Sequence, residues 1–261
     1  MASVNPVLLF PAALQARAEA LGAAYVASLS QGAGQFCTNP GIVLGGAGAG
    51  FDRFTASARA ALESVAPQVM LTQAIHRHYG DGVAALLAHP GVSLVARGVA
   101  GDGYNQCQAA LFLTDAATIR AHPALTQELF GAVSLIIRCA DVAEMAALVA
   151  AMEGQLTVTL QLDEADEPLA APLVPMLERK AGRLLANGWP TGVEVAQAMV
   201  HGGPYPATSD PRTTSVGAAA IERFLRPICY QSFPGALLPG LLDPANSLGV
   251  PRLVDGVANP R

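Results

Sequence analysis

The hydrophobic positions of this chain follow two alternating spacings, one typical of helices and one typical of buried strands. Residues 14–29 are rich in alanine and other helix-forming residues, and the glycines at positions 32–34 end this run. The short apolar run Ile42-Val43-Leu44 that follows predicts a buried strand. The same alternation continues along the chain. It predicts further strands over residues 92–96, 108–113, 133–138 and 156–162. It also predicts helices over residues 51–65, 71–87, 142–152 and 173–181, and a short helix that Asp115 caps.

The predicted strands are apolar on both faces, which is typical of a parallel sheet that helices cover on two sides. We therefore expect an α/β fold with a mainly parallel sheet and helices on both faces. Right-handed crossovers align the carboxyl ends of such strands along one edge of the sheet, where α/β proteins usually place their sites. The sequence thus predicts functional residues at that edge.

The last third of the chain changes character. Residues 187–217 are polar and turn-forming, a helix is expected over residues 218–224, and the Pro- and Gly-rich residues 233–261 are expected to be extended and to pack on the parent fold or on a neighbour. We therefore predict a thiol-bearing catalytic domain over residues 1–200 and a C-terminal segment of loops, helix and extended chain over residues 201–261.

The composition excludes several classes of protein. With 52% hydrophobic and 13% charged residues, the chain is expected to bury much of its surface against something else, and we expect a homo-oligomer. A net charge of −5 argues against a nucleic-acid partner. No window is apolar for the ~18 to 20 residues that a membrane span needs, and the start lacks the features of a signal peptide, so a cytoplasmic location without a membrane partner is expected.

The sequence offers little sign of a metal or phosphate site. Its four cysteines, Cys37, Cys107, Cys139 and Cys229, form no CxxC pair, so neither a zinc site nor a disulfide framework is indicated. His76 and His78 would point to different faces of a helix, and we interpret them as surface residues. The glycine-rich run over residues 45–50 lacks the spacing of a phosphate-binding motif, which favours a flexible surface turn there.

Cys37 is the candidate nucleophile. It lies in the turn Gly34-Gln35-Phe36-Cys37-Thr38-Asn39-Pro40-Gly41, between a predicted helix and a predicted strand. A thiol attacks as its thiolate, and a polar turn can supply both exposure and hydrogen-bond donors. The alternative is that Cys37 packs as a small hydrophobic residue, as free cysteines often do.

Several stretches together resemble the aldehyde dehydrogenase superfamily. Gly34-Gln35-Phe36-Cys37 resembles the cysteine motif of that family, and Glu128-Leu129-Phe130-Gly131 resembles its Glu-x-Phe-Gly motif. Each motif alone is of modest specificity, but their order and separation extend along nearly the whole chain. The branch of the family that acts on α-ketoglutaric semialdehyde is the most similar in three further segments, at residues 187–195, 201–209 and 226–231.

The resemblance implies roles for particular residues. In the family the thiolate, here Cys37, attacks the aldehyde carbon, and its main-chain amide helps to hold the oxyanion. Glu128 would contact the nicotinamide-side ribose of NAD or NADP, and Phe130 would pack against that end of the cofactor. Without the family pattern, Glu128 would be interpreted as a solvated carboxylate. Thr208, Ser209 and Arg212 could line the path of a carboxylate-ended substrate, or they could serve only to form turns.

The resemblance also implies that parts of the family pattern lie outside this sequence. The general-base glutamate would fall just before the first residue, and the dinucleotide-binding half would precede it. Ala132 stands where the family usually has proline, which removes a fixed φ from the loop after Glu128. We therefore expect a small-molecule aldehyde as substrate and a nucleotide-binding half as partner, with no cofactor bound by this chain alone. The alternatives are a non-catalytic fragment that acts as an oligomerising module and a cofactor-independent Cys37 esterase.

Overall fold

The computed structural model describes residues 2–259. The chain forms two compact units, Met1–Arg223 and Phe224–Arg261. The predicted boundary at residue 200 divides the proposed catalytic region from the C-terminal segment, not two compact units, and it stays a prediction.

The first unit is built on a seven-stranded sheet. Six strands are parallel, and β4 at one edge runs antiparallel to its neighbour, with a bulge between Leu94 and Ala96. This confirms the predicted α/β fold with a mainly parallel sheet. In order across the sheet the strands are β4 (Ser93–Arg97), β6 (Ala110–Asp115), β7 (Val133–Cys139), β2 (Ile42–Gly46), β1 (Val7–Leu9), β8 (Gln155–Gln161) and β9 (Ala181–Ala186).

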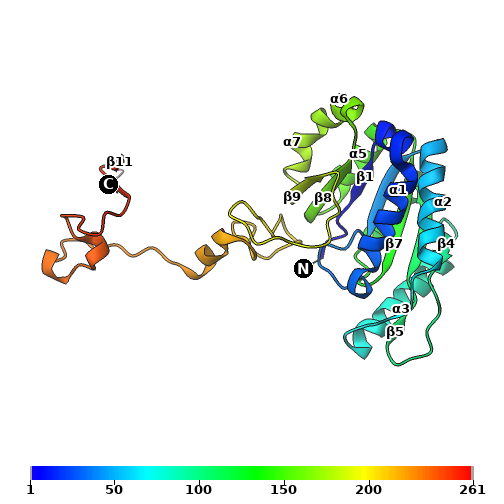
Figure 1. The fold of residues 1–261 in the computed structure, drawn as a ribbon, viewed down its shortest axis with the longest axis horizontal. Coiled ribbons are helices and arrows are strands. Elements are labelled where there is room, and N and C mark those ends of the chain that lie inside the picture. The colour runs from blue at the N-terminus through cyan, green and yellow to red at the C-terminus, as the bar shows by residue number, and fades with distance from the viewer. Residues whose placement is uncertain (1, 260–261) are drawn as a thin grey trace. The chain divides into compact units, whose positions relative to one another are not determined.

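Helices cover both faces of this sheet. The long helices α1 (Pro11–Ser30) and α2 (Ala49–Glu63) lie side by side and bury their apolar side chains in one core with residues of β1, β2 and β7 (Figure 1). The opposite face is covered by α3 (Gln73–Ala88), α4 (Ala116–Ala121) and α5 (Val142–Ala151). Between α2 and β6, the two-residue strands β3 (Gln68–Val69) and β5 (Gln106–Cys107) form a small separate sheet.

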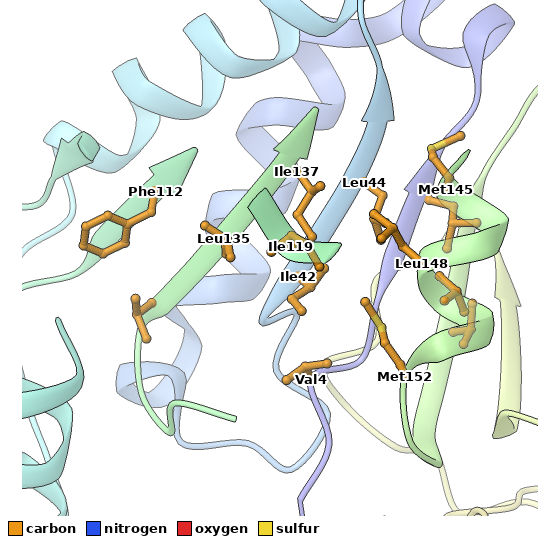
Figure 2. Close-up of a cluster of buried hydrophobic side chains, with 14 of the residues drawn as sticks. Val4, Ile42, Leu44, Phe112, Ile119, Leu135, Ile137, Met145, Leu148 and Met152 are labelled. Atoms are coloured by element: carbon orange, nitrogen blue, oxygen red, sulfur yellow. The ribbon is translucent and has the colours of Figure 1, made fainter. Parts of the chain in front are cut away.

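The core between the sheet and the helices α3, α4 and α5 shows why the central strands are apolar on both faces. Figure 2 shows Ile42 and Leu44 of β2 beside Leu135 and Ile137 of β7, with Ile119 of α4 among them and Met145 and Leu148 of α5 on the side of Leu44. All four of these strand residues are less than 5% exposed. Alternate residues of the same strands face α1 and α2, so both faces of these central strands are covered, as expected for a parallel sheet.

Polar side chains define where the helices begin. The carboxylate of Asp115 accepts a hydrogen bond from the amide of Thr118 at 2.7 Å, which confirms the predicted cap of α4. Asp166 is distant in sequence from α1, yet its buried carboxylate accepts from the amides of Ala12 and Ala13 at 2.9 and 3.0 Å. It therefore satisfies two donors that the first turn of α1 leaves free.

The predicted helix over residues 173–181 is wrong. The structure has only short turns there: η3 (Glu164–Asp166), α6 (Glu167–Ala170), η4 (Ala171–Leu173) and α7 (Val174–Leu177). Pro172 and Pro175 lack the amide donors that a continuous helix needs, and Ala181 already begins β9. The helix expected over residues 218–224 is the 3₁₀-helix η5 (Ala218–Phe224).

The second unit contains short elements rather than a wholly extended chain. Two 3₁₀ turns, η6 (Gly235–Leu237) and η7 (Gly240–Leu242), precede an antiparallel hairpin of β10 (Arg252–Val254) and β11 (Val257–Asn259). Across residues 2–259, every helix is too short or too polar to span a bilayer.

Candidate active site

The candidate nucleophile lies at the amino ends of the parallel strands. Cys37 follows the 3₁₀ turn η1 (Gln31–Gly34) and precedes β2, while Glu128 and Phe130 lie between the 3₁₀ turn η2 (Pro123–Thr126) and β7. Because β2 and β7 are parallel neighbours, the loops that lead into them meet at the same edge. The predicted location at the carboxyl ends is therefore wrong for these residues, because each of them precedes its strand instead of following it.

Asn5 fixes the main chain of the cysteine turn. Its Nδ2 donates to the carbonyl oxygens of Cys37 and Asn39 at 3.0 and 2.9 Å. Its Oδ1 accepts from the hydroxyls of Ser3 and Thr157 at 2.8 and 3.1 Å. Asn5 is fully buried, and these four hydrogen bonds fix its side chain and thereby the main chain of the cysteine turn.

The loops carrying Cys37 and Glu128 are in direct main-chain contact. Gly34 has a φ of +67°, and a Cβ there would collide with the main chain of Gly131 and Ala132. The side-chain amide of Asn39 also donates to the carbonyl of Gly131 at 3.1 Å. Only glycine at position 34 allows both this conformation and this approach.

His201 lies against the thiol of Cys37. The distance between its Nε2 and the Sγ of Cys37 is 3.2 Å. The main chain of His201 is anchored on both sides, because its amide donates to Thr214 Oγ1 at 2.8 Å and its carbonyl accepts from the amide and hydroxyl of Ser215 at 3.0 and 2.9 Å. The imidazole is therefore presented to the thiol by a loop with fixed hydrogen bonds.

Two glycines press that loop onto the sheet. A Cβ on Gly203 would collide with the carbonyl of Gln155, the first residue of β8. A Cβ on Gly182, the second residue of β9, would collide with the carbonyl of Gly202. The His201 loop thus rests on the amino ends of β8 and β9, at the edge that also holds the Cys37 turn.

The electrostatic environment keeps Cys37 and His201 uncharged near neutral pH. Burial raises the pKa of the Cys37 thiol, the amides of Cys37 and Thr38 oppose this rise, and the charges of Glu128 and Arg183 act in opposite directions. Burial also lowers the pKa of His201, and the positive charge of Arg183 lowers it further. The resting pair is a thiol beside a neutral imidazole, which can accept its proton.

Arg183 supplies the fixed positive charge near this pair. It lies on β9, and its guanidinium donates to the carbonyls of Pro190 and Gly192 at 2.7 and 3.3 Å. Because both acceptors are neutral carbonyls, these hydrogen bonds do not neutralise the positive charge of the guanidinium. Arg183 therefore favours a negative charge on the sulfur and disfavours a positive one on the imidazole.

Glu128 and Phe130 line a cavity of about 430 Å³ beside the cysteine turn. Phe130 is 37% exposed, and burial raises the pKa of Glu128 while the amide of Ser3 opposes that rise. Asn39 also lines the cavity, and its buried Oδ1 has no hydrogen-bond partner among the described residues. The cavity therefore combines a mostly apolar wall with a carboxylate, an exposed aromatic ring and a free acceptor.

The three residues predicted to line the substrate path do not line the cavity beside the cysteine turn. Thr208 donates to the carbonyl of Gly203 at 2.7 Å and so supports the His201 loop. Ser209 is exposed, and Arg212 forms an exposed ion pair with Asp210 at 3.0 Å. These contacts favour the turn-forming interpretation, and the role of the three residues toward substrate stays a prediction.

Sequence reasoning missed His201, Arg183 and Asn5. His201 stands in the segment 201–209 that resembles the aldehyde dehydrogenases, but that segment had suggested only substrate contacts. Arg183 is the one charged residue of β9, a strand that the sequence analysis did not predict. Asn5 followed Ser3 and Val4 without any local pattern, so only the fold reveals its contacts with Cys37 and Asn39.

Two curated relatives match the chain along nearly its whole length. An α-ketoglutaric semialdehyde dehydrogenase 2 of Azospirillum brasilense is 55% identical over 258 residues, which are 99% of this chain and 49% of that protein. An α-ketoglutaric semialdehyde dehydrogenase of Acinetobacter baylyi is 46% identical over 258 residues, 98% of this chain and 49% of that protein. The chain thus spans about half the length of the curated relatives it matches, and no protein-family model matches it.

Solved structures share the fold at lower identity. Proline utilization A from Bdellovibrio bacteriovorus superposes with a TM-score of 0.73 at 18% identity, covering 88% of this chain and 23% of that one. The Δ-pyrroline-5-carboxylate dehydrogenase from Mycobacterium tuberculosis, solved with NAD, superposes with a TM-score of 0.65 at 16% identity, covering 78% and 38%. These structures show the fold alone. The two relatives at 55% and 46% identity confirm the resemblance seen in the motifs: over nearly its whole length, this chain is similar to about half of an aldehyde dehydrogenase.

Proposed function

We propose that this chain supplies the nucleophile of an NAD- or NADP-dependent aldehyde dehydrogenase that oxidises α-ketoglutaric semialdehyde to the acid. The observation that carries the proposal is the meeting of two motifs distant in sequence: the Cys37 turn and the Glu128–Gly131 loop touch through Gly34 and Asn39. The substrate is taken from the two relatives, whose names specify that aldehyde.

Cys37 would act on the aldehyde carbon. Its thiol is exposed on one side, so a small carbonyl compound can reach the sulfur. The sulfur forms a bond to the carbonyl carbon, and the negative charge that develops on the oxygen is stabilised by the main-chain amide of Cys37. The product of this step is a thiohemiacetal on Cys37.

The cavity beside this turn suits one end of a dinucleotide cofactor. The Glu128 carboxylate can accept hydrogen bonds from ribose hydroxyls, and the exposed ring of Phe130 can pack against a planar ring. NAD or NADP, when bound, would accept the hydride that converts the aldehyde carbon to the level of the acid. Of the residues described here, Glu128 and Phe130 are the ones that would hold it.

The remaining requirements would come from a second half. The relatives are about twice as long as the region that the chain matches, so we propose that the nucleotide-binding half belongs to another part of a longer chain or to another polypeptide. The described chain by itself would then carry the nucleophile without completing turnover.

A chimera tests this proposal. In it, this chain replaces the 258-residue region that it matches in the A. brasilense relative. We expect the chimera to form reduced cofactor from α-ketoglutaric semialdehyde. The Cys37→Ala chimera should lose activity by at least about 10³-fold, because Cys37 is the proposed nucleophile. A Cys229→Ala chimera should keep its activity. The proposal is contradicted if Cys37→Ala keeps its rate. A folded but inactive chimera would instead support a non-catalytic module.

The contact between Cys37 and His201 favours a second candidate function, the hydrolysis of esters without a cofactor. A thiol paired with an imidazole is the arrangement that thiol-dependent acyl transfer uses. Hydrolysis of p-nitrophenyl acetate by the isolated chain, lost in Cys37→Ala, would support it. Equal rates for the chain and for Cys37→Ala would exclude it.

A further inference from the structure

We propose that His201 is a catalytic residue that accepts the proton of the Cys37 thiol as the sulfur attacks. This inference rests on the proposed function only in taking Cys37 as the nucleophile. In this proposal, the neutral imidazole of His201 activates the thiol of Cys37.

The geometry places the acceptor where the proton must go. Nε2 of His201 lies 3.2 Å from Sγ of Cys37, within the range for a hydrogen bond to sulfur. The imidazole is held by the hydrogen bonds of Thr214 and Ser215 to its main chain and by the packing of Gly203 on β8. A base held within hydrogen-bond reach of a thiol is the first requirement for general-base activation.

Both partners start in the state that the step requires. Burial is the main cause of both pKa shifts, and the charged groups that also act on the pair are Glu128, which precedes β7, and Arg183, on β9. Because the Cys37 pKa is raised, the thiol keeps its proton at rest and needs a base. Because the His201 pKa is lowered, the imidazole is neutral and has a free lone pair for that proton.

The step balances as a simple addition. The S–H bond of Cys37 breaks and its proton moves to Nε2 of His201, while the sulfur lone pair forms the S–C bond to the aldehyde carbon. The π electrons of the carbonyl move to its oxygen, which becomes an alkoxide. The imidazolium beside Arg183 can then return the proton to that oxygen, giving a neutral thiohemiacetal and restoring the neutral imidazole, so nothing is oxidised or reduced.

Alkylation of the thiol in the full chain tests the assignment without any cofactor. We expect the rate of iodoacetamide labelling of Cys37 at pH 7, followed by peptide mass spectrometry, to fall by about 10-fold or more in His201→Asn, since a positioned base contributes ~10²–10⁴-fold to a full catalytic step. Asparagine keeps a polar side chain but cannot take the proton. The exposed Cys229 is an internal reference thiol, and the exposed His78→Asn is the matched control variant.

Two further readouts separate a base from a merely structural residue. In the wild type the Cys37 labelling rate should level off above the pKa of His201, whereas in His201→Asn it should rise with pH until the thiol itself ionises. Added imidazole should restore labelling in His201→Ala, and Cys229 labelling should stay unchanged. The assignment would be overturned if Cys37 labelling is unaltered in His201→Asn. It would also be overturned if imidazole fails to rescue a His201→Ala variant in which the buried Cys107 and Cys139 remain protected from labelling.

These results are independent of the dehydrogenase assay. If Cys37→Ala leaves the chimera active, the proposed function fails whatever the labelling shows. If the chimera needs Cys37 but His201→Asn leaves the labelling of Cys37 unaltered, the proposed function stands and only the role of His201 fails.

Discussion

The side-chain amide of Asn5 donates a 3.0 Å hydrogen bond to the main-chain carbonyl of Cys37, and so ties the segment before β1 to the nucleophile turn. Asn5→Ala would leave this carbonyl without its donor and the buried hydroxyl of Thr157 without its acceptor. We expect the free energy of unfolding to fall by ~2–4 kcal/mol, because each buried group left unpaired costs ~1–3 kcal/mol. Urea unfolding measures it, and the exposed control Gln73→Ala should stay within about 0.5 kcal/mol of the wild type.

The contact between Gly34 and the Gly131 main chain gives a second prediction. Gly34→Ala adds a methyl group where the main chain of Gly131 already lies, at a φ that alanine rarely adopts. We expect a loss of ~3 kcal/mol or more in the free energy of unfolding. Gly80→Ala is the matched control, because it lies inside α3 with open space around its Cβ position and should be neutral or stabilising by up to ~1 kcal/mol. Equal effects of the two substitutions would contradict the contact.

The charge of Glu128 predicts a change in the reactivity of Cys37. Because that charge raises the pKa of the thiol, Glu128→Gln should lower it and increase the thiolate fraction at any pH below the pKa. The lower pKa makes each thiolate a somewhat weaker nucleophile, but this offsets only about half of the gain. Iodoacetamide labelling of Cys37 at pH 7 should therefore speed up, while the exposed Glu63→Gln should leave it unchanged. Slower labelling in Glu128→Gln would refute the electrostatic account.

The lowered pKa of His201 predicts how stability depends on pH. Near the ordinary histidine pKa of 6.5, the folded state binds fewer protons at His201 than the unfolded state does. The free energy of unfolding should therefore decrease as the pH falls through about 6.5. His201→Asn lacks this titration, so unfolding curves at about pH 5.5 and 7.5 should differ less for the variant than for the wild type. An identical pH dependence would contradict the lowered pKa.

Apolar side chains of the second unit predict self-association. Leu225, Ile228, Leu237 and Leu253 are each more than half exposed in this chain. Replacing Leu237 and Leu253 by serine should shift a sedimentation-velocity profile toward the monomer, because burial of apolar surface drives association. The control Val195→Ser alters an equally exposed residue of the first unit. A wild-type chain that sediments as a monomer at every concentration would refute this prediction.

Much of the fold could be predicted from hydrophobic spacing. The helices α1, α2, α3 and α5 and the buried strands β2, β6, β7 and β8 are long enough for their apolar pattern to stand out. The strand β1 has only three residues between Pro6 and Phe10, so its central place in the sheet depends on pairing with β2 and β8. The strand β9 lies at the edge of the sheet, and its sequence Ala-Gly-Arg-Leu-Leu-Ala has no alternation of apolar and polar residues that would mark a strand.

The candidate site was predictable only where a motif marked it. Cys37, Glu128 and Phe130 came from short motifs, and the structure places them at one edge of the sheet. The contact of Cys37 with His201 joins residues 164 positions apart, and local periodicity contains no information about such a distance. The same limit explains the wrong sheet edge, because strand direction alone does not reveal which loops carry the chemistry.

The glycine-rich loop between β2 and α2 has a different consequence. Residues 47–49 are exposed at the carboxyl ends of the strands, at the opposite edge from Cys37. That loop can therefore be lengthened, labelled or fused to another protein without displacing a group near the thiol. Evolution and engineering can thus remodel one edge of this sheet while the chemistry is kept at the other.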